Sequence, residues 1–211
     1  MRKTTWGIRG VLAAVAVALA PAMAVAQPAA RDTGLILGSV EAAATRPVER
    51  IADFSLLVDL SERTLYVMSG DDVVRRFPVA VGAQGYATPS GSFRIQRMIW
   101  NPSWTPPASA WARNETAKGP GEPGNPMGRV KIFFREPDYY IHGTNLTSSL
   151  GNARSHGCIR LRNIDAVELA KMVMVHGGSD RGEDWYRQTI ASATTSRTVT
   201  LERPVTVRVR A

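Results

Sequence analysis

The segment Ser155-His156-Gly157-Cys158-Ile159-Arg160-Leu161 contains the single cysteine of this 211-residue chain. It follows Ile141-His142-Gly143-Thr144-Asn145, so two of the three histidines stand near the thiol in the sequence. A thiol attacks a carbonyl carbon as the thiolate, and a neighbouring imidazole is a common way to generate that form. A cysteine that only fills a hydrophobic core is the alternative, but His156 and Arg160 beside it need polar partners. The segment therefore predicts an acyl-transfer enzyme whose nucleophile is Cys158.

The two nearby histidines are expected to have different roles. A strand expected at Tyr139–His142 ends on His142, and a returning strand would bring its imidazole opposite Cys158. We therefore predict that His142 is the base and later the acid, while His156 helps to shape the site. Gly143 also belongs to the site-shaping residues but has no side chain. The group that orients His142 is therefore expected to be a backbone carbonyl or a remote residue.

Residues around the cysteine are candidates for stabilising and binding a substrate. Gly157 frees the backbone just before Cys158, so the amides of these two residues are predicted to face a developing oxyanion. Arg160 is a candidate clamp for a substrate carboxylate, and pairing with an acid such as Asp165 is the alternative. Ser155 joins the site-shaping residues, and the substrate-binding candidates are Arg160, Tyr140 and Trp104.

A zinc site is the main chemical alternative to a thiol nucleophile. His142, His156 and Cys158 could supply three ligands and leave one position open, as catalytic zinc sites do. The chain has no second cysteine and no His-Glu-x-x-His pattern to support this reading. We therefore predict neither a metal ion nor a cofactor.

The first 26 residues have the pattern of a secretory signal peptide. Basic residues at the start precede the apolar run of residues 11–20, and Ala24-Val25-Ala26 offers a cleavage site. A membrane anchor is the alternative, but a spanning helix needs about 20 apolar residues. The pattern predicts an exported, periplasmic protein with no membrane span after cleavage. A lone cysteine in such a protein indicates a reactive thiol or an intermolecular bridge.

The charge of the chain narrows the choice of partner. Its formal net charge is +8, and arginine outnumbers lysine, which suits bidentate contacts with carboxylates or phosphates. Export and the lack of a binding motif weigh against nucleic acid. A cell-wall polymer rich in carboxylates is the better match, although a solvated basic surface would have the same composition.

The pattern of apolar residues predicts a mainly β domain at residues 51–211. Residues 27–50 are expected to form a tether or loosely packed arm, although Leu35 to Leu37 and Val40 could dock on the domain. Closing strands are expected around Val199 to Val209, after a weaker helix at Arg181 to Ser196. The other expected strands are Phe54–Leu60, Thr64–Met68, Val73–Val81, Ser92–Met98, Val130–Phe134 and Tyr139–His142.

One clear helix is expected after the cysteine. Ile164, Val167, Ala170 and Met174 recur at helical spacing. Asp165 with Glu168 resembles a capping box, and Gly177 stands where a C-terminal cap is expected. His176, in the last turn, is expected to be a charge partner of the helix end.

A long segment without periodicity, Trp100 to Gly128, separates two of the expected strands. It is rich in proline and glycine and carries three of the five tryptophans. Loops of this length in a compact domain usually serve as a lid or a binding wall. A proline-stiffened surface loop over packed aromatic residues is the alternative.

These motifs, taken in order, resemble the YkuD-type L,D-transpeptidases of bacterial cell walls, in their Cys-Ile-Arg-Leu branch. The resemblance covers the chain from Phe54 onward. It rests on Val58-Asp59-Leu60 through Thr64-Leu65-Tyr66-Val67, Thr88-Pro89-Ser90-Gly91-Ser92-Phe93, Asn101-Pro102-Ser103-Trp104, Gly124-Asn125-Pro126-Met127-Gly128, Ile141-His142-Gly143-Thr144 and Ser155-His156-Gly157-Cys158.

The resemblance implies a YkuD-like β-sandwich of mixed sheets, with one supporting helix after the cysteine and a long loop over the site. It also implies that Cys158 is the nucleophile and His142 the proton donor and acceptor. The substrates would be peptidoglycan stem peptides, attacked at the third residue with release of the terminal D-alanine. An acceptor amine would then resolve the thioester, giving a 3→3 cross-link or attaching a wall protein such as a lipoprotein. A hydrolase that uses the same Cys158 and His142, an L,D-carboxypeptidase or an enzyme that detaches wall proteins, remains the alternative, since transfer and hydrolysis differ in acceptor access and water exclusion.

Overall fold

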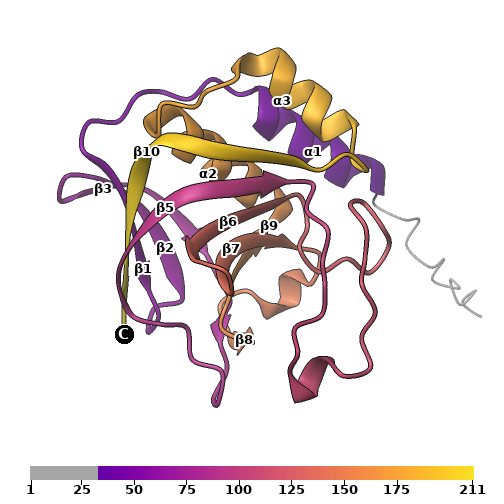
Figure 1. Ribbon diagram of the computed structural model, residues 1–211. Helices are drawn as coiled ribbons and strands as arrows, with labels where there is room; N and C mark the ends of the chain where they lie inside the picture. The colour runs from indigo at the N-terminus through magenta and orange to yellow at the C-terminus, as the bar shows by residue number, and fades with distance from the viewer. Residues whose placement is uncertain (1–32) are drawn as a thin grey trace, which may run out of the picture. The chain divides into compact units, whose positions relative to one another are not determined.

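The computed structural model describes residues 33–211, with side chains from residue 39 onward. The signal segment expected at residues 1–26, and residues 27–32 of the expected arm, lie outside the described part. The described chain forms a mixed sheet of eight strands in the order β3-β2-β1-β10-β5-β6-β7-β9, and β4 pairs with β8 in a separate two-stranded sheet (Figure 1). The elements are α1 (Thr33–Thr45), β1 (Phe54–Asp59), β2 (Thr64–Ser69), β3 (Asp72–Pro78), β4 (Val81–Gly82), β5 (Gly91–Trp100), β6 (Val130–Arg135), β7 (Tyr139–Thr144), β8 (Ala153–Ser155), β9 (Ile159–Arg162), α2 (Asn163–His176), α3 (Gly182–Ala191) and β10 (Arg197–Arg210), with short 3-10 turns at Ala110–Ala112 and Thr147–Ser149.

The mainly β class is confirmed, and most expected strands agree with the structure to within two residues. The expected strand at Val73–Val81 is divided, because β3 ends at Pro78, whose nitrogen has no hydrogen to donate. Val81 then starts β4, which pairs with β8. The expected closing strands are one long strand, β10, with an irregularity in its pairing between Thr200 and Val205.

Two parallel pairings decide how the sheet is assembled. β1 pairs with β10 from the other end of the chain, and β7 pairs with β9. Neither pairing can be made by a tight hairpin, because parallel strands need a longer crossover. The crossover from β7 to β9 carries β8 and the turn at Thr147–Ser149. It returns the chain so that the residues around Cys158 lie next to the strand that carries His142.

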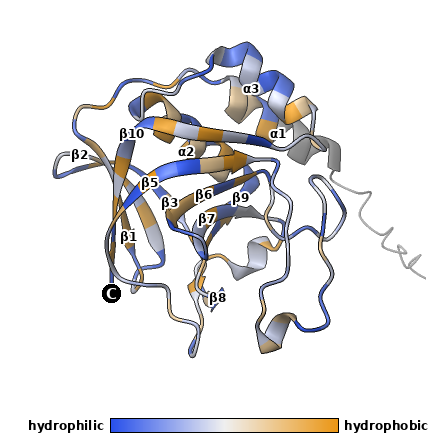
Figure 2. Cartoon of the chain, in the orientation of Figure 1, coloured by the Kyte–Doolittle hydropathy of each residue, from blue (hydrophilic) through white to orange (hydrophobic). Residues whose placement is uncertain are grey.

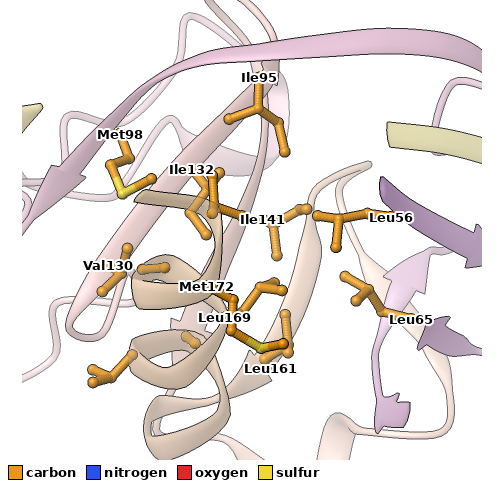
Figure 3. Close-up of a cluster of buried hydrophobic side chains, with 14 of the residues drawn as sticks. Leu56, Leu65, Ile95, Met98, Val130, Ile132, Ile141, Leu161, Leu169 and Met172 are labelled. Atoms are coloured by element: carbon orange, nitrogen blue, oxygen red, sulfur yellow. The ribbon is translucent and has the colours of Figure 1, made fainter. Parts of the chain in front are cut away.

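The hydrophobic core lies between the sheet and α2. Alternating residues of each strand point to this side, which gives the strands their mixed hydropathy in Figure 2. Figure 3 shows the central members of the cluster: Leu56, Leu65, Ile95, Met98, Val130, Ile132, Ile141, Leu161, Leu169 and Met172. All of these side chains are buried. Because α2 covers this side of β6, β7 and β9, the intervening residues of these strands project to the opposite face.

The structure has a helix where a loosely packed arm was expected. α1 covers residues 33–45 and contacts both α2 and α3. Val40, Ala43 and Ala44 are buried, so the docking considered for Val40 is correct. At the end of α1, the buried Lys171 ammonium donates to the carbonyl oxygens of Ala44 and Arg46. An alanine-rich segment has little hydrophobic periodicity, yet alanine has the highest helix propensity and lets helices approach closely.

The predicted helix after the cysteine is α2, and Gly177 is its C-terminal cap as expected, but the expected capping box at its start is absent. No side chain caps its start, and Asp165 instead accepts two hydrogen bonds from the Arg162 guanidinium, at 2.7 and 2.9 Å. Near its other end, His176 accepts a hydrogen bond from the Ile51 amide at 2.8 Å, and its ring stacks on Phe54. Burial lowers the pKa of His176. His176 is therefore a packing residue and not the charge partner that was expected.

The expectation of one supporting helix is incomplete, because residues 33–211 form three α-helices. α3 occupies Gly182–Ala191, inside the range predicted for a weaker helix. It packs against α1, and Figure 1 shows these two helices side by side. The long segment after β5 is held by the chain that follows α3.

Candidate active site

Three neighbouring strands build the polar face of the sheet. Lys131 on β6 is paired with His142 on β7, and His142 is paired with Arg160 on β9, so the three form one row across the strands. Cys158 stands immediately before β9 and continues this register beside Tyr140. Paired residues on neighbouring strands project to the same side of a sheet. The parallel pairing of β7 with β9 therefore places Cys158 and His142 on one face, in diagonal positions.

This face is the floor of a cavity of about 940 Å³, near the upper end of the usual range of about 300–1,000 Å³ for ligand sites. His142, Cys158 and Arg160 line it, and so do residues of the segment between β5 and β6, from Trp104 to Met127. The prediction of a long loop over the site is therefore confirmed. A hollow of this size, with a wall built by the loop, can hold an extended peptide.

Two asparagines fix the long loop in place. The Asn101 side-chain amide donates to three backbone carbonyls within residues 189–195, at 2.7 to 3.1 Å. Asn125 donates in the same way to the carbonyls of Pro102 and Gly119, at 2.9 and 2.8 Å. The wall of the cavity is thus attached to the end of α3 and closed on itself by side-chain hydrogen bonds.

Cys158 is half-buried and unpaired in the structure. Its thiol donates to the Asp138 carbonyl oxygen at 3.4 Å. Burial raises the pKa of the Cys158 thiol, while hydrogen bonding from Tyr140 and the charges of Lys131 and Arg160 oppose that rise. The resting sulfur is thus a neutral thiol that opens on the cavity, and is not sealed in the core.

His142 is buried, and its ring is held by the backbone. Nδ1 lies 2.8 Å from the carbonyl oxygen of Gly143, so Nδ1 carries the hydrogen and donates it there. The orienting carbonyl that was expected from the lack of a side chain at Gly143 is therefore present. Burial, together with the neighbouring charges of Arg160 and Lys131, lowers the pKa of His142 to about 3, against the raising effect of nearby carbonyls. The imidazole is neutral at physiological pH and able to accept a proton.

The buried neutral imidazole should make stability depend on pH. Its folded pKa of about 3 lies below the ordinary value of 6.5, so the unfolded chain binds more protons between these values and stability falls as the pH falls. We expect the free energy of unfolding of the wild type to decrease from about pH 6.5 to about pH 4 more steeply than that of His142→Gln. Urea denaturation at a series of pH values measures this. Equal slopes for the two proteins would contradict it, since the other two histidines are present in both.

Asn163, the first residue of α2, positions the strand end that carries His142. Its side-chain oxygen accepts a hydrogen bond from the Arg129 amide at 3.0 Å, and its nitrogen donates to the Asn145 side chain at 2.7 Å. A Cβ at Gly143 would lie 2.2 Å from this oxygen, and one at Gly128 only 2.0 Å from it. Both glycines are therefore required for the close approach of Asn163. A glycine at position 143 is thus needed for packing, in addition to its position beside the imidazole.

Ser155 organises the turn that presents the cysteine. Its hydroxyl donates to the Cys158 carbonyl oxygen at 2.5 Å and accepts a hydrogen bond from the Gly157 amide at 3.1 Å. Gly157 has a φ of +102°, a conformation that favours glycine. The expectation that the Gly157 amide faces an oxyanion does not agree with this structure, because Ser155 already accepts its hydrogen. Gly157 shapes the turn, and the Cys158 amide stays the candidate oxyanion donor.

His156 connects two loops at the rim of the cavity. Its ring is stacked on Trp111 with a centroid distance of 3.8 Å, and Tyr86 meets it edge-on at 4.6 Å. Burial lowers the pKa of His156, as does the charge of Arg160. The side chain thus packs between the loop before β5 and the loop after it, and its site-shaping role stays a prediction.

The substrate-binding candidates all line the cavity. Trp104 is nevertheless buried, and its backbone pairs with Lys118, so it contributes mainly to the loop wall. Asp165 is paired with Arg162 and not with Arg160, so Arg160 does not form the structural ion pair with Asp165 that was considered as the alternative. The Arg160 side chain lines the cavity instead.

Two further findings concern the described residues. Residues 33–211 contain no group of three or more histidine, cysteine, aspartate or glutamate side chains placed to hold a metal ion. Within the same part of the chain, none of the helices combines the length and apolar character needed to cross a membrane.

A family model described as the L,D-transpeptidase catalytic domain, YkuD, matches residues 53–205. The chain belongs to the YkuD family. The matched region runs from the residue before β1 into β10 and includes all the candidate site residues. The resemblance drawn from the sequence motifs is therefore confirmed, together with the YkuD-like fold.

Other YkuD-family proteins show how much of the chain is shared. A "Putative L,D-transpeptidase YkuD" of Bacillus licheniformis is 35% identical over 120 residues, which are 57% of this chain and 60% of that protein. A "Probable L,D-transpeptidase YbiS" of Escherichia coli strain K12 is 35% identical over 120 residues, 54% of this chain and 39% of that protein. The chain thus spans less than two thirds of either relative. A solved L,D-transpeptidase of Mycobacterium smegmatis is 18% identical with a TM-score of 0.47, covering 76% of this chain and 59% of that one.

Sequence reasoning missed several residues of this YkuD-family site. In the sequence, Lys131 is an ordinary basic residue of a strand that also contains Arg135. Only the pairing of β6 with β7 places it beside His142. Asn163 reads as the start of a helix, and Trp111 as part of an irregular loop. The available signal was alternation along β6, which puts Lys131 on the face opposite to Val130 and Ile132.

Proposed function

We propose that this chain is a cysteine-dependent L,D-transpeptidase that acts on peptidoglycan stem peptides. The observation that carries the proposal is the position of a half-buried thiol and a buried, neutral imidazole on one face of the sheet, inside the same cavity. Membership of the YkuD family supports the type of reaction. Cys158 is the nucleophile, and His142 is the group that moves the proton.

The first half of the reaction transfers the stem to the enzyme. The Cys158 sulfur attacks the carbonyl carbon of the third residue, and its proton passes to the His142 nitrogen that does not contact Gly143. His142 is suited to this step because its ring is fixed by the Gly143 carbonyl at 2.8 Å and is uncharged at rest. The tetrahedral intermediate then collapses: the carbon–nitrogen bond breaks, and His142 returns the proton to the departing D-alanine amine. The product is a thioester on Cys158.

The second half resolves the thioester. An acceptor amine attacks the thioester carbonyl, gives a proton to His142, and displaces the sulfur, which takes that proton back as a thiol. Attack by the amine of a second stem gives a 3→3 cross-link, and attack by a wall-protein amine attaches that protein. Water in place of the amine gives the hydrolase considered as the alternative. Export to the periplasm, inferred from residues 1–26, would place the enzyme beside this substrate.

The test is the reaction itself. Purified protein is incubated with a wall tetrapeptide, with and without an acceptor stem, and the protein mass and released D-alanine are measured. We expect an adduct at Cys158 of the mass of the tripeptide acyl group, one D-alanine for each adduct, and cross-linked product when acceptor is present. Tripeptide as the only product in excess acceptor would assign the chain to the hydrolases. The absence of both adduct and D-alanine would contradict the proposal.

A further inference from the structure

Lys131 is a cation in the cavity to which the proposed reaction assigns no role. It lines the cavity with Cys158, and its ammonium lies 4.0 Å from the centre of the Tyr140 ring and 5.0 Å from that of Phe133. Among the residues that the structure describes, no carboxylate lies within the 4.0 Å of an ion pair with it. Aromatic rings compensate a buried ammonium only in part. The Lys131 charge is therefore available to an anion that enters the cavity.

Arg160 is a second cation of the same kind. It also lines the cavity and makes none of the ion pairs of the described residues, whereas its neighbour Arg162 is paired with Asp165. The cavity has two carboxylates of its own, Glu115 and Asp138. Neither forms an ion pair with these cations, although the Asp138 charge acts on Lys131 from a greater distance. Two unpaired cations in a partly dehydrated site favour a ligand that brings negative charge.

The strand register separates the two cations. Lys131 and Arg160 are both paired in register with His142, one on each side, so their backbones are two strand spacings apart, about 9–10 Å. Arg160 is on the strand that begins next to Cys158, and Lys131 is on the far side of the imidazole. The charges of both side chains nevertheless act on the Cys158 thiol, so an acyl group on Cys158 would have two cations within reach, held by different strands.

We propose that Lys131 and Arg160 form a receptor for two carboxylates of the donor stem, and that Lys131 selects a third residue whose side chain ends in a carboxylate. The inference rests on the proposed function. The C-terminal carboxylate lies one residue beyond the carbonyl under attack and binds Arg160. The second carboxylate, at the end of the third residue's side chain, binds Lys131. A donor whose third side chain ends in an amide, or in an amine alone, leaves the Lys131 charge unpaired.

The test compares three tetrapeptides that differ only in the third residue: diaminopimelate, the same residue with its side-chain carboxylate converted to an amide, and lysine. The proteins are the wild type, Lys131→Met and Lys131→Arg, with Arg94→Met as a matched control on the exposed side of β5. The ratio of kcat/KM for the carboxylate donor to kcat/KM for the amide donor is measured by D-alanine release. We expect a ratio of about 10 to 100 for the wild type and Arg94→Met, from the usual strength of a hydrogen bond to a charged group.

In Lys131→Met this ratio is expected to fall towards 1, and Lys131→Arg should restore most of it. A Lys131→Met variant that slows all three donors by the same factor would overturn the proposal, because Lys131 would then act on the thiol or on the fold. The pH profile of iodoacetamide labelling separates these two cases, since an effect on the thiol shifts that profile and a purely structural one lowers the melting temperature.

A binding measurement keeps the inference separate from the proposed function. Calorimetric titration of Cys158→Ala with the same peptides reports selectivity without any reaction. Preference for the carboxylate peptide that is lost in Cys158→Ala/Lys131→Met would support the receptor. This holds even if no donor acylates the wild type, because a lack of acylation would contradict only the proposed transpeptidase activity. Equal binding of the carboxylate and amide peptides to Cys158→Ala would overturn the receptor.

Discussion

Replacing Cys158 with alanine is expected to abolish both the tripeptide adduct and the release of D-alanine, with a loss of at least about 10⁴-fold. The reason is chemical, because the chain has no other thiol and an alanine cannot form the acyl-enzyme. The change removes a half-buried side chain that donates a hydrogen bond to the Asp138 carbonyl at 3.4 Å. The fold should therefore survive the substitution, and thermal melting checks this.

Cys158→Ser is the matched variant for this experiment. It keeps a side chain of similar shape that can donate to Asp138, but its hydroxyl is a much weaker nucleophile than a thiol in the same place. We expect Cys158→Ser to fold as the wild type does and to give no adduct in the time of the wild-type reaction. Turnover that persists in Cys158→Ala would mean that the nucleophile is another residue, and would remove the basis of the proposed mechanism.

Replacing His142 with alanine is expected to slow acylation of Cys158 by about 10²- to 10⁴-fold, the usual contribution of a positioned acid–base group. The structure gives the reason, since the pKa of Cys158 is raised by burial and the thiol needs a partner that takes its proton. Single-turnover mass spectrometry measures the acylation step separately from attack by the acceptor. Melting temperatures show whether the cavity left by the buried ring destabilises the protein.

His156→Ala is the control for His142→Ala. The His156 ring packs against Trp111 and Tyr86 at the cavity rim. Its loss should therefore disturb substrate binding and raise KM more than it lowers the rate of acylation. We expect less than about a 10-fold decrease in the acylation rate, below the usual acid–base contribution. A larger acylation defect in His156→Ala than in His142→Ala would reverse the roles proposed for the two histidines.

Much of the local structure could be predicted because it depends on neighbouring residues. Alternating apolar residues predicted the hairpin of β1 with β2, and helical spacing predicted α2 after the cysteine. The failures have local causes too. The alanine-rich residues 33–45 lack a strong apolar pattern, and their helix is stabilised by contact with α2 and α3. Pro78 was included in a strand that it ends.

The details of the site were less predictable, since they depend on residues far apart in the chain. A backbone carbonyl was one of two alternatives for the group that orients His142, and the structure has the Gly143 carbonyl in that position. The Gly157 amide, in contrast, is engaged by Ser155, and no sequence pattern announces that bond. The choice of Arg162 as the partner of Asp165 also depends on which strand face each arginine occupies.

The amino-acid sequence by itself determined which reactive groups are present, namely one thiol and a histidine, His142, that is followed by a glycine. It also determined the mainly β class and the resemblance to the YkuD family. Residue types and short-range spacing carry this information, since they determine reactivity, turns and periodicity. Only the tertiary structure decided which groups share the cavity. The parallel pairing of β7 with β9 and the antiparallel pairing of β7 with β6 put Lys131, His142 and Arg160 in one row next to Cys158. Strand register is set by packing against α2 and by long-range hydrogen bonds, and these interactions join segments that are distant in the sequence.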